Sequence, residues 1–318
     1  MATTPRFFSA EEVHAALDWR SLVDALRAAF REGASAPVRH AHVVNEAERA
    51  RLLLMPAWRE GKELGVKLVT VFPENPRRGL ATVSGLYVLM DGATGHPLAI
   101  LDGDALTLRR TGAASALAST YLSRKDARTL LVIGTGRLAP WMAAAHCSVR
   151  EFERVLVWGR SAEKARRLAG RLKDEGLPAR GAADLAGAAA QADVVTCATT
   201  AREPVLLGRW LRPGMHVDLA GAYAADMRES DDALVARAEI FVDTFAGALK
   251  EAGDLVQPMA RGIIGRDALR ADLADLAAGR HPGRTAPEQI TLFKSVGAAL
   301  EDLCAARLAT ERAGDRAS

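Results

Sequence analysis

The most constraining feature of this chain is the stretch 130–139, where an apolar run is followed by a glycine-rich turn. An alanine-rich segment comes next, so the order is that of the strand, GxGxxA turn and helix in a dinucleotide-binding βαβ unit. The free N–H groups at such a helix N-terminus favour a diphosphate. We therefore predict a dinucleotide site at the turn, the alternative being a glycine-rich turn in an α/β fold that binds no nucleotide. The turn consists of Gly134, Thr135, Gly136, Arg137, Leu138 and Ala139.

The sequence around this turn predicts a parallel sheet. Short apolar runs alternate with helical stretches after residue 125, which is the pattern of a doubly wound α/β domain. The helical stretch 162–172 is one example. The predicted strands are 129–133, 154–158, 193–198, 216–220 and 240–242.

The first part of the chain has a different pattern of predicted helices and strands. Ser9 and Glu12 form a capping box before a helical period, and short β-rich runs between glycine and proline follow from 41 to 101. A helix is predicted over 104–122, and a second helical period runs over 288–308. If the last helix packs back on the first region, that α+β domain is discontinuous. The predicted domains are residues 1–124 with 289–318, and a Rossmann domain over 125–288.

Composition excludes several classes of partner and site. Lys and Arg number 42 against 39 Asp and Glu, a net charge of +3, and only 5% of residues are aromatic. Without a basic run, nucleic acid is not an expected partner, and the apolar runs are too short for a membrane span. Three cysteines without CxxC spacing suit reduced thiols in the cytosol, and no zinc or other metal site is expected.

The residues after the second predicted strand bear on the choice of cofactor. NAD sites place a carboxylate there for the ribose hydroxyl, whereas a 2′-phosphate needs cations and donors. This chain has Arg160 and Ser161, with Lys164 one turn further on. We predict NADPH, with NADH possible but disfavoured; the alternative is that Arg160 is an ordinary surface arginine. Thr199, after the fourth predicted strand, is a further candidate cofactor ligand, the alternative being an ordinary loop threonine.

Three cations mark a candidate substrate site. Lys67 interrupts an otherwise apolar strand and shares its face with Gly65 and Val69, so its ammonium should point inward. It would be an anion ligand or a proton donor, or else a lysine on an exposed face. Arg110, in a helix rich in small residues, could bind a carboxylate with its planar fork. Arg39, before the predicted sheet, is a third cation, although on its own it would be interpreted as a surface residue.

The chain resembles the ornithine cyclodeaminase/μ-crystallin family. The resemblance implies a Rossmann domain inserted into an α+β substrate and dimerisation domain, a homodimer, and a substrate carboxylate surrounded by Arg39, Lys67 and Arg110. Ser295 joins the predicted cofactor ligands. The motifs that carry it are GVKLV at 65–69, LDG at 101–103, RTGAASA at 110–116, GTG at 134–136, HVDLAG at 216–221 and FKSVG at 293–297.

One position separates this chain from the cyclodeaminases, which have an Asp where Tyr223 stands; Tyr223 is taken as a substrate-binding residue. The stretch 216–229 resembles the branch that reduces Δ1-pyrroline-2-carboxylate and Δ1-piperideine-2-carboxylate. The resemblance therefore implies an NADPH-dependent reductase of small cyclic imino acids that yields L-proline or L-pipecolate. The alternatives are an amino-acid dehydrogenase of the alanine dehydrogenase type, a cyclodeaminase-like lyase, and a non-catalytic NADPH-dependent ligand binder.

Two histidines and an aspartate receive plainer interpretations. His216 opens a buried strand and is predicted to be a core histidine, and His146 to be a packing residue. Asp218 would orient a neighbouring group.

Overall fold

The computed structural model describes residues 4–315, and its contacts divide the chain into two units. One unit comprises Met1–Arg110 with Ala298–Ser318, and the other comprises Thr111–Gly297. The first boundary falls inside helix α3 (Gly103–Leu122), earlier than the residue 124 expected from the sequence. The second falls after residue 288, because the strand β14 (Thr291–Lys294) belongs to the sheet of the second unit.

A six-stranded sheet forms the frame of the first unit. Its order is β1-β6-β5-β4-β3-β2; β1 runs parallel to β6 and all other neighbours are antiparallel. The β-rich runs predicted over 41–101 are confirmed as strands of this sheet. The strands are β1 (Arg6–Phe8), β2 (His40–Asn45), β3 (Ala50–Arg59), β4 (Glu63–Val71), β5 (Val83–Asp91) and β6 (Pro97–Asp102), with a short 3₁₀ turn, η1 (Asn75–Arg78), between β4 and β5.

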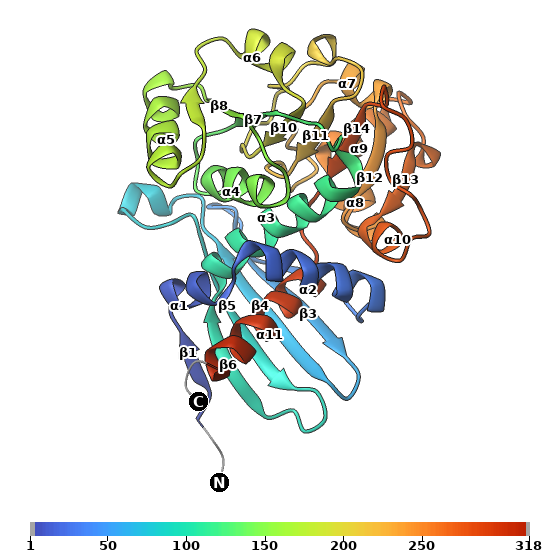
Figure 1. Ribbon diagram of the computed structural model, residues 1–318. Coiled ribbons are helices and arrows are strands. Elements are labelled where there is room, and N and C mark those ends of the chain that lie inside the picture. Colours follow the sequence, from blue (N-terminus) through green and yellow to red (C-terminus); the bar gives the residue numbers. More distant parts are fainter. Residues whose placement is uncertain (1–3, 316–318) are drawn as a thin grey trace. The chain divides into compact units, whose positions relative to one another are not determined.

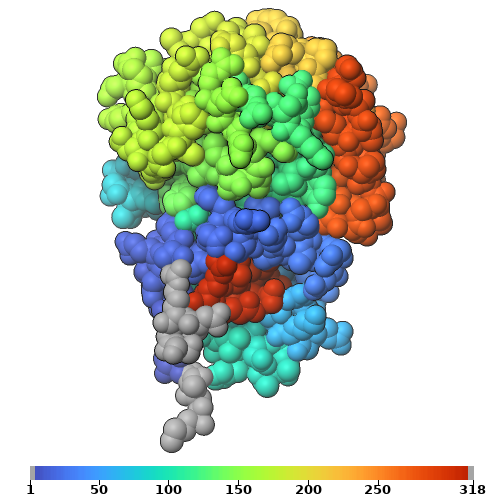
Figure 2. Space-filling view, viewed as in Figure 1, coloured from blue at the N-terminus to red at the C-terminus, as the bar shows by residue number. Residues whose placement is uncertain are grey.

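Three helices belong to this unit besides the start of α3. They are α1 (Ala10–Ala16), α2 (Trp19–Glu32) and α11 (Ala299–Asp315), and α11 packs on β3, β4, β5, α1 and α2 (Figure 1). In the space-filling view, part of α11 is visible as a red surface beside the blue α2 (Figure 2). The predicted capping box of Ser9 and Glu12 is present at the start of α1. The return of the last helix to the first region is therefore confirmed.

The expected helix over 288–308 is wrong in its first part, where residues Thr291–Lys294 form the strand β14. All four residues of β14 are buried between neighbouring parallel strands. A short apolar run buried on both faces does not alternate, so its pattern cannot be distinguished from that of a buried helix.

The face of the sheet opposite Lys67 is apolar. Leu54, Leu68 and Leu86 are in register across β3, β4 and β5, and the row of Pro56, Val66 and Val88 lies beside them. None of these side chains is buried, and Leu68 and Leu86 are exposed.

The second unit contains an eight-stranded parallel sheet in the order β13-β12-β14-β11-β10-β7-β8-β9. All five predicted strands are present, which confirms the doubly wound fold. The strands are β7 (Thr129–Ile133), β8 (Arg154–Trp158), β9 (Ala179–Gly181), β10 (Val194–Cys197), β11 (His216–Leu219), β12 (Glu239–Val242), β13 (Leu269–Asp272) and β14. The helices are α4 (Ala139–Val149), α5 (Ala162–Asp174), α6 (Leu185–Gln191), α7 (Asp232–Arg237), α8 (Phe245–Glu251), α9 (Gly253–Ala260) and α10 (Leu273–Ala277), with 3₁₀ turns η2 (Gly208–Trp210) and η3 (Arg266–Ala268).

The strand order reverses direction at β7. The chain adds β8 and β9 on one side of β7 and then crosses over to add β10 and β11 on the other. Open α/β sheets bind ligands outside the carboxyl ends of their strands at such a switch point. Among the described helices, none combines the length and apolar character that crossing a membrane requires.

Candidate functional site

The glycine turn of the second unit lies at the switch point, directly after β7. Gly134 has a φ of 126°, a conformation that other residues rarely adopt. A Cβ on Gly134 would lie 2.6 Å from the carbonyl oxygen of Ala198 at the end of β10. The turn therefore requires glycine at this position for two independent reasons. Thr135 occupies the space beside Gly159, where a Cβ would lie 2.6 Å from the Thr135 methyl carbon.

The next residues of the turn leave room for a ligand. Gly136 is exposed, and no atom lies within 4 Å of the position that a Cβ would occupy. Arg137 is exposed, Leu138 is half-buried and α4 begins at Ala139, which is buried. An open backbone at the start of an eleven-residue helix suits a diphosphate, because the first N–H groups of a helix have no partner within it. These residues fit a dinucleotide.

The residues that follow β8 are Gly159, Arg160 and Ser161, which include one cation and no carboxylate. The side chains of Arg160 and Lys164 are exposed. The Ser161 hydroxyl caps α5 by accepting a hydrogen bond from the backbone N–H of Lys164 at 3.3 Å. It still has its own proton to donate, so the three residues can present positive charge and a donor around the N-terminus of α5.

Thr199, predicted as a cofactor ligand, is engaged by a carboxylate that the sequence did not indicate. Its backbone N–H and its hydroxyl donate to Glu229 Oε1 at 2.7 and 2.8 Å. The other oxygen, Oε2, accepts from the backbone N–H groups of Gly221 and Ala222 at 2.9 and 3.2 Å. Glu229 thus joins the loops that follow β10 and β11. No pattern in the sequence separates it from the other acidic residues of its loop.

Glu229 is fully buried and shares its surroundings with two more buried charges. Lys294 Nζ lies 3.2 Å from Asp254 Oδ2 and donates to the carbonyl oxygen of Ala222 at 2.5 Å. Asp254 Oδ1 accepts from the backbone N–H groups of Glu229 and Ser230. Burial raises the pKa of Glu229 to about 6, with the Lys294 charge opposing this rise and the Asp254 charge adding to it.

The loop after β14 is fixed by a third buried carboxylate. Asp243 Oδ2 accepts from the backbone N–H groups of Val296 and Gly297 at 2.7 and 2.6 Å. Ser295 is buried, and its N–H donates to the carbonyl oxygen of Leu219. Its role as a cofactor ligand stays a prediction.

The interpretation of His146 as a packing residue is corrected by its partner. His146 and Asp218 are both fully buried, and His146 Nε2 lies 3.0 Å from Asp218 Oδ2. Ser115 and Thr196 also donate to this carboxylate, which confirms that Asp218 orients its neighbours. His146 belongs to a polar network that holds α3, α4, β10 and β11 together. A helical apolar pattern could not reveal it, because the partner is 72 residues away.

His216 is the buried core histidine that its position predicted. It is fully buried, and its Nδ1 lies 3.0 Å from the hydroxyl of Thr291. Burial lowers its pKa to about 3, so its imidazole is neutral at physiological pH.

In the first unit, Lys67 is only 3% exposed, which confirms the inward direction predicted from the strand period. Its Nζ lies 2.9 Å from both carboxylate oxygens of Asp302 on α11 and 3.2 Å from the hydroxyl of Thr107 on α3. Arg110 is buried beside it and donates to Asp302 at 3.2 Å and to Glu301 at 2.8 Å.

The pKa of Lys67 is lowered to about 8, chiefly by burial. The carboxylate of Asp302 opposes this shift, while the positive charges of Arg110 and Arg39 add to it. Arg39 is half-buried just before β2, and its charge is among those that act on Lys67. Its role in binding a substrate stays a prediction. A lysine with this pKa is mostly protonated at neutral pH yet gives up its proton more readily than an ordinary one.

Glu301 and Asp302 were missed by the sequence analysis. They lie in the helical period predicted over 288–308, which is defined by its apolar positions and does not single out the adjacent acidic pair. The signal that could have found them is the buried lysine itself, because a buried cation requires a carboxylate. Tyr223, in contrast, is 42% exposed in the loop after β11, and its role in substrate binding stays a prediction.

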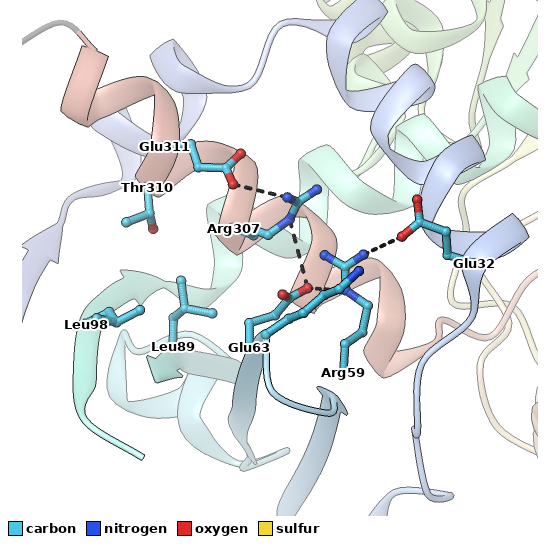
Figure 3. Close-up of a pocket in the computed structure, with 9 residues that line it drawn as sticks. Glu32, Arg59, Glu63, Leu89, Leu98, Arg307, Thr310 and Glu311 are labelled. Carbon is cyan, nitrogen blue, oxygen red and sulfur yellow. Dashed lines mark hydrogen bonds and ion pairs between the residues drawn. The ribbon is translucent and has the colours of Figure 1, made fainter. Parts of the chain in front are cut away.

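A separate pocket of about 510 Å³ lies in the first unit and contains none of the predicted site residues (Figure 3). Its polar wall is a chain of ion pairs in which Glu311, Arg307, Glu63, Arg59 and Glu32 alternate in charge. Because each arginine in this chain of ion pairs faces carboxylates, the chain ties α11 and α2 to the sheet.

The described part of the chain contains no group of three or more His, Cys, Asp or Glu residues arranged to hold a metal ion. The three cysteines are unpaired thiols. Burial raises the pKa of Cys147 and of Cys304 to about 12, so neither is a reactive thiolate at neutral pH.

Comparison with known proteins adds the family. Residues 4–317 match the model of the ornithine cyclodeaminase/mu-crystallin family. A Delta(1)-pyrroline-2-carboxylate reductase of Colwellia psychrerythraea is 36% identical, over 98% of this chain and 100% of the relative. The structure of the Thermococcus litoralis Delta(1)-pyrroline-2-carboxylate reductase, in complex with NADH and L-proline, is similar with a TM-score of 0.93, 36% identity and 98% of each chain covered. An archaeal alanine dehydrogenase dimer with bound NAD has a TM-score of 0.91 at 29% identity, with 99% of this chain and 97% of the other covered. The chain therefore belongs to the ornithine cyclodeaminase/mu-crystallin family.

Proposed function

We propose that this protein is an oxidoreductase that uses NAD(P)H to reduce the C=N bond of a small cyclic imino acid. Δ1-Pyrroline-2-carboxylate, which would yield L-proline, is the first candidate substrate, and Δ1-piperideine-2-carboxylate, which would yield L-pipecolate, is the second. The observation that carries the proposal is the pair of buried cations, Lys67 and Arg110, in a chain whose other unit has an open glycine turn for a dinucleotide.

The cations would bind the carboxylate of the substrate. The guanidinium of Arg110 can hold a carboxylate at two points, and the positive charge of Arg39 also acts on Lys67. Glu301 and Asp302 keep the Arg110 side chain in place, so a substrate would meet a cation whose orientation is already set.

Lys67 is the candidate proton donor. The cofactor, when bound, supplies the hydride, and a protonated C=N bond accepts hydride far better than a neutral one. Lys67 Nζ, held by Asp302 and Thr107, can deliver that proton with a pKa of about 8, close to the pH at which an acid catalyst works best. After the transfer the neutral amine can still donate a hydrogen bond to Asp302, whose negative charge favours the return of a proton to Lys67.

A pyrroline carboxylate reductase is favoured over the other activities found among relatives. The solved reductase shares more of its sequence with this chain than the solved alanine dehydrogenase does, at 36% against 29%. Tyr223 stands where the resemblance places an Asp in cyclodeaminases, which disfavours that lyase activity. A non-catalytic binder would have no need for a buried lysine whose pKa is shifted toward neutrality. The cytosolic location expected from the unpaired thiols stays a prediction.

We also propose that two copies associate through the apolar face of the six-stranded sheet. On β3, β4 and β5 that face presents in-register rows of leucine, valine and proline; on β6 the rows continue with Ile100 and with Asp102, whose carboxylate accepts a hydrogen bond from the backbone N–H of Ala105. Exposed apolar surfaces of this kind mark interaction sites, and two-fold symmetry is the commonest arrangement of identical subunits.

The first prediction concerns the reaction. NADPH oxidation followed by absorbance should be fast with Δ1-pyrroline-2-carboxylate or Δ1-piperideine-2-carboxylate and slow with pyruvate plus ammonia. Arg110→Ala should lower kcat/KM by about 2–5 kcal/mol of transition-state binding, and Arg110→Lys by less, because it keeps the charge but loses the two-point contact. The matched control is Arg109→Ala, since Arg109 bonds His14 and lies over the Trp19 ring. Equal losses in the two alanine variants would contradict the carboxylate site.

The second prediction concerns pH. Because Lys67 must be protonated to act as an acid, kcat/KM should fall as pH rises above about 8. Lys67→Met should lower kcat/KM by about 100-fold or more and abolish this limb. Lys67→Arg keeps the positive charge but does not titrate in this range, so it should also lose the limb. A limb that persists in both variants would exclude Lys67 as the proton donor.

The third prediction concerns the cofactor. Arg160 and Ser161 should make NADPH the better reductant, although the solved relatives hold NADH or NAD. Arg160→Asp should shift the ratio of kcat/KM values for NADPH and NADH at least about tenfold toward NADH, because it exchanges attraction for repulsion of the 2′-phosphate. Arg154→Asp, at the opposite end of the same strand, is the control and should leave the ratio unchanged. Equal use of both cofactors by the parent enzyme would refute this assignment.

The fourth prediction concerns assembly. The native chain, of 33.9 kDa, should sediment as a dimer. Leu68→Glu should shift it toward monomer because it places a charge within the apolar face. Ile263→Glu, an exposed apolar residue of the second unit, should not. A native protein that sediments as a monomer at all concentrations would contradict the proposal.

A further inference from the structure

The most unusual buried group outside the substrate cations is the carboxylate of Glu229. The largest charge effects on it come from Lys294 of β14 and Asp254 of α9, and the Cys197 thiol of β10 is also within electrostatic range. The pKa of Cys197 is raised well above its usual value by burial, so this thiol stays neutral. Burying an ionisable group costs several kcal/mol unless hydrogen bonds and a counter-charge compensate it. A neutral side chain of the same shape would avoid that cost.

What a carboxylate offers here, and an amide does not, is acceptance at both oxygens. Glu229 takes hydrogen bonds from four donors, two from Thr199 and one each from Gly221 and Ala222. A glutamine would turn one end of the group into a donor facing backbone N–H groups. The site is built for an acceptor with two oxygens.

The two loops that Glu229 joins are pressed together. A Cβ on Gly221 would lie 2.1 Å from the Thr199 carbonyl oxygen and 2.5 Å from Glu229 Oε1. Lys294 holds the same turn from the other side through the carbonyl oxygen of Ala222. The Gly221 turn is therefore clamped at its N–H groups by Glu229 and at a carbonyl by Lys294.

These loops lie on one side of the switch point. They follow β10 and β11, whereas Gly136 and Arg160 follow β7 and β8. In a doubly wound fold the dinucleotide extends across the switch point. With the diphosphate at the glycine turn and the ribose phosphate at Arg160, the nicotinamide half extends toward β10 and β11.

We propose that Glu229 is a positioning residue for the nicotinamide half of the cofactor, and that it acts by clamping the Thr199 and Gly221 loops with Lys294 behind them. The inference rests on the proposed dinucleotide site. Glu229 itself need not touch the cofactor, because both of its oxygens are occupied by the loops.

A binding experiment on the full chain separates this role from a general structural one. Affinities for NADP⁺ and for 2′-phospho-ADP-ribose, which lacks the nicotinamide, are measured by calorimetry. In Glu229→Gln the affinity for NADP⁺ should fall about tenfold or more, while that for the truncated ligand changes less than about threefold. Glu203→Gln changes an exposed carboxylate of the loop between β10 and β11 and is the matched control, with both affinities retained. Thr199→Val removes one of the four donors and should show the same pattern with a smaller loss, which keeps the test valid if Glu229→Gln does not fold.

The ratio of the two affinities also carries a pH signature. The 2′-phosphate titrates in both ligands, so its contribution cancels in the ratio. Because the pKa of Glu229 is about 6, the native ratio should fall as pH drops from 7 to 5 and the carboxylate gains a proton. In Glu229→Gln the ratio should be low and independent of pH.

Equal losses for both ligands in Glu229→Gln and Thr199→Val, or no loss in either variant, would overturn the positioning role while leaving the dinucleotide site intact. If the native protein binds neither ligand, the proposed function itself fails and this inference fails with it.

Discussion

Buried positive charge is the constraint on which much of this structure depends. An ammonium group removed from water must meet a carboxylate, and each unit has one such pair: Lys67 with Asp302, and Lys294 with Asp254. In the first unit this pairing helps to explain why the last helix returns across the sheet, because α11 carries the carboxylates that Lys67 and Arg110 require. The C-terminal helix thus completes the buried charge cluster around Lys67 and Arg110, although it is far from both in sequence.

How far the sequence predicts the site depends on whether the signal is local. Gly134 and Gly136 are separated by one residue, and the roles of both follow from their place between a strand and a helix. Lys67 was predicted to point inward from the alternation of one strand. Its partner is 235 residues away, and such pairings leave no trace in a local pattern. The same holds for His146 and Asp218, whose contact depends on how the helices cover the parallel sheet.

The strand β14 shows that a local pattern can also fail within a single segment. Its four residues are buried on both faces, so neither alternation nor a helical period is visible, and the flanking apolar residues extended the false helix. Glu229 was missed for a related reason. Its loop contains several acidic residues, and only the approach of Gly221 to Thr199 makes one of them a shared acceptor. Predicting it would have required the geometry of two loops that the sequence does not place in contact.

The shifted pKa values of Glu229 and Lys67 show that burying their charged forms lowers the stability of the folded protein. The pKa of Glu229 is raised from 4.5 to about 6, so its favourable contribution to folding is complete below 4.5 and is lost as pH rises through 6. The pKa of Lys67 is lowered from 10.5 to about 8, so its contribution is complete above 10.5 and is lost as pH falls through 8. Between pH 6 and 8 the folded protein therefore bears the cost of both charges. That interval is also the one in which Lys67 holds a proton to donate and Glu229 can accept from all four donors. Neutral groups at these two positions would avoid that cost. They would also leave Asp302 without the ammonium that pairs with it, and the Thr199 and Gly221 loops without the acceptor that they share.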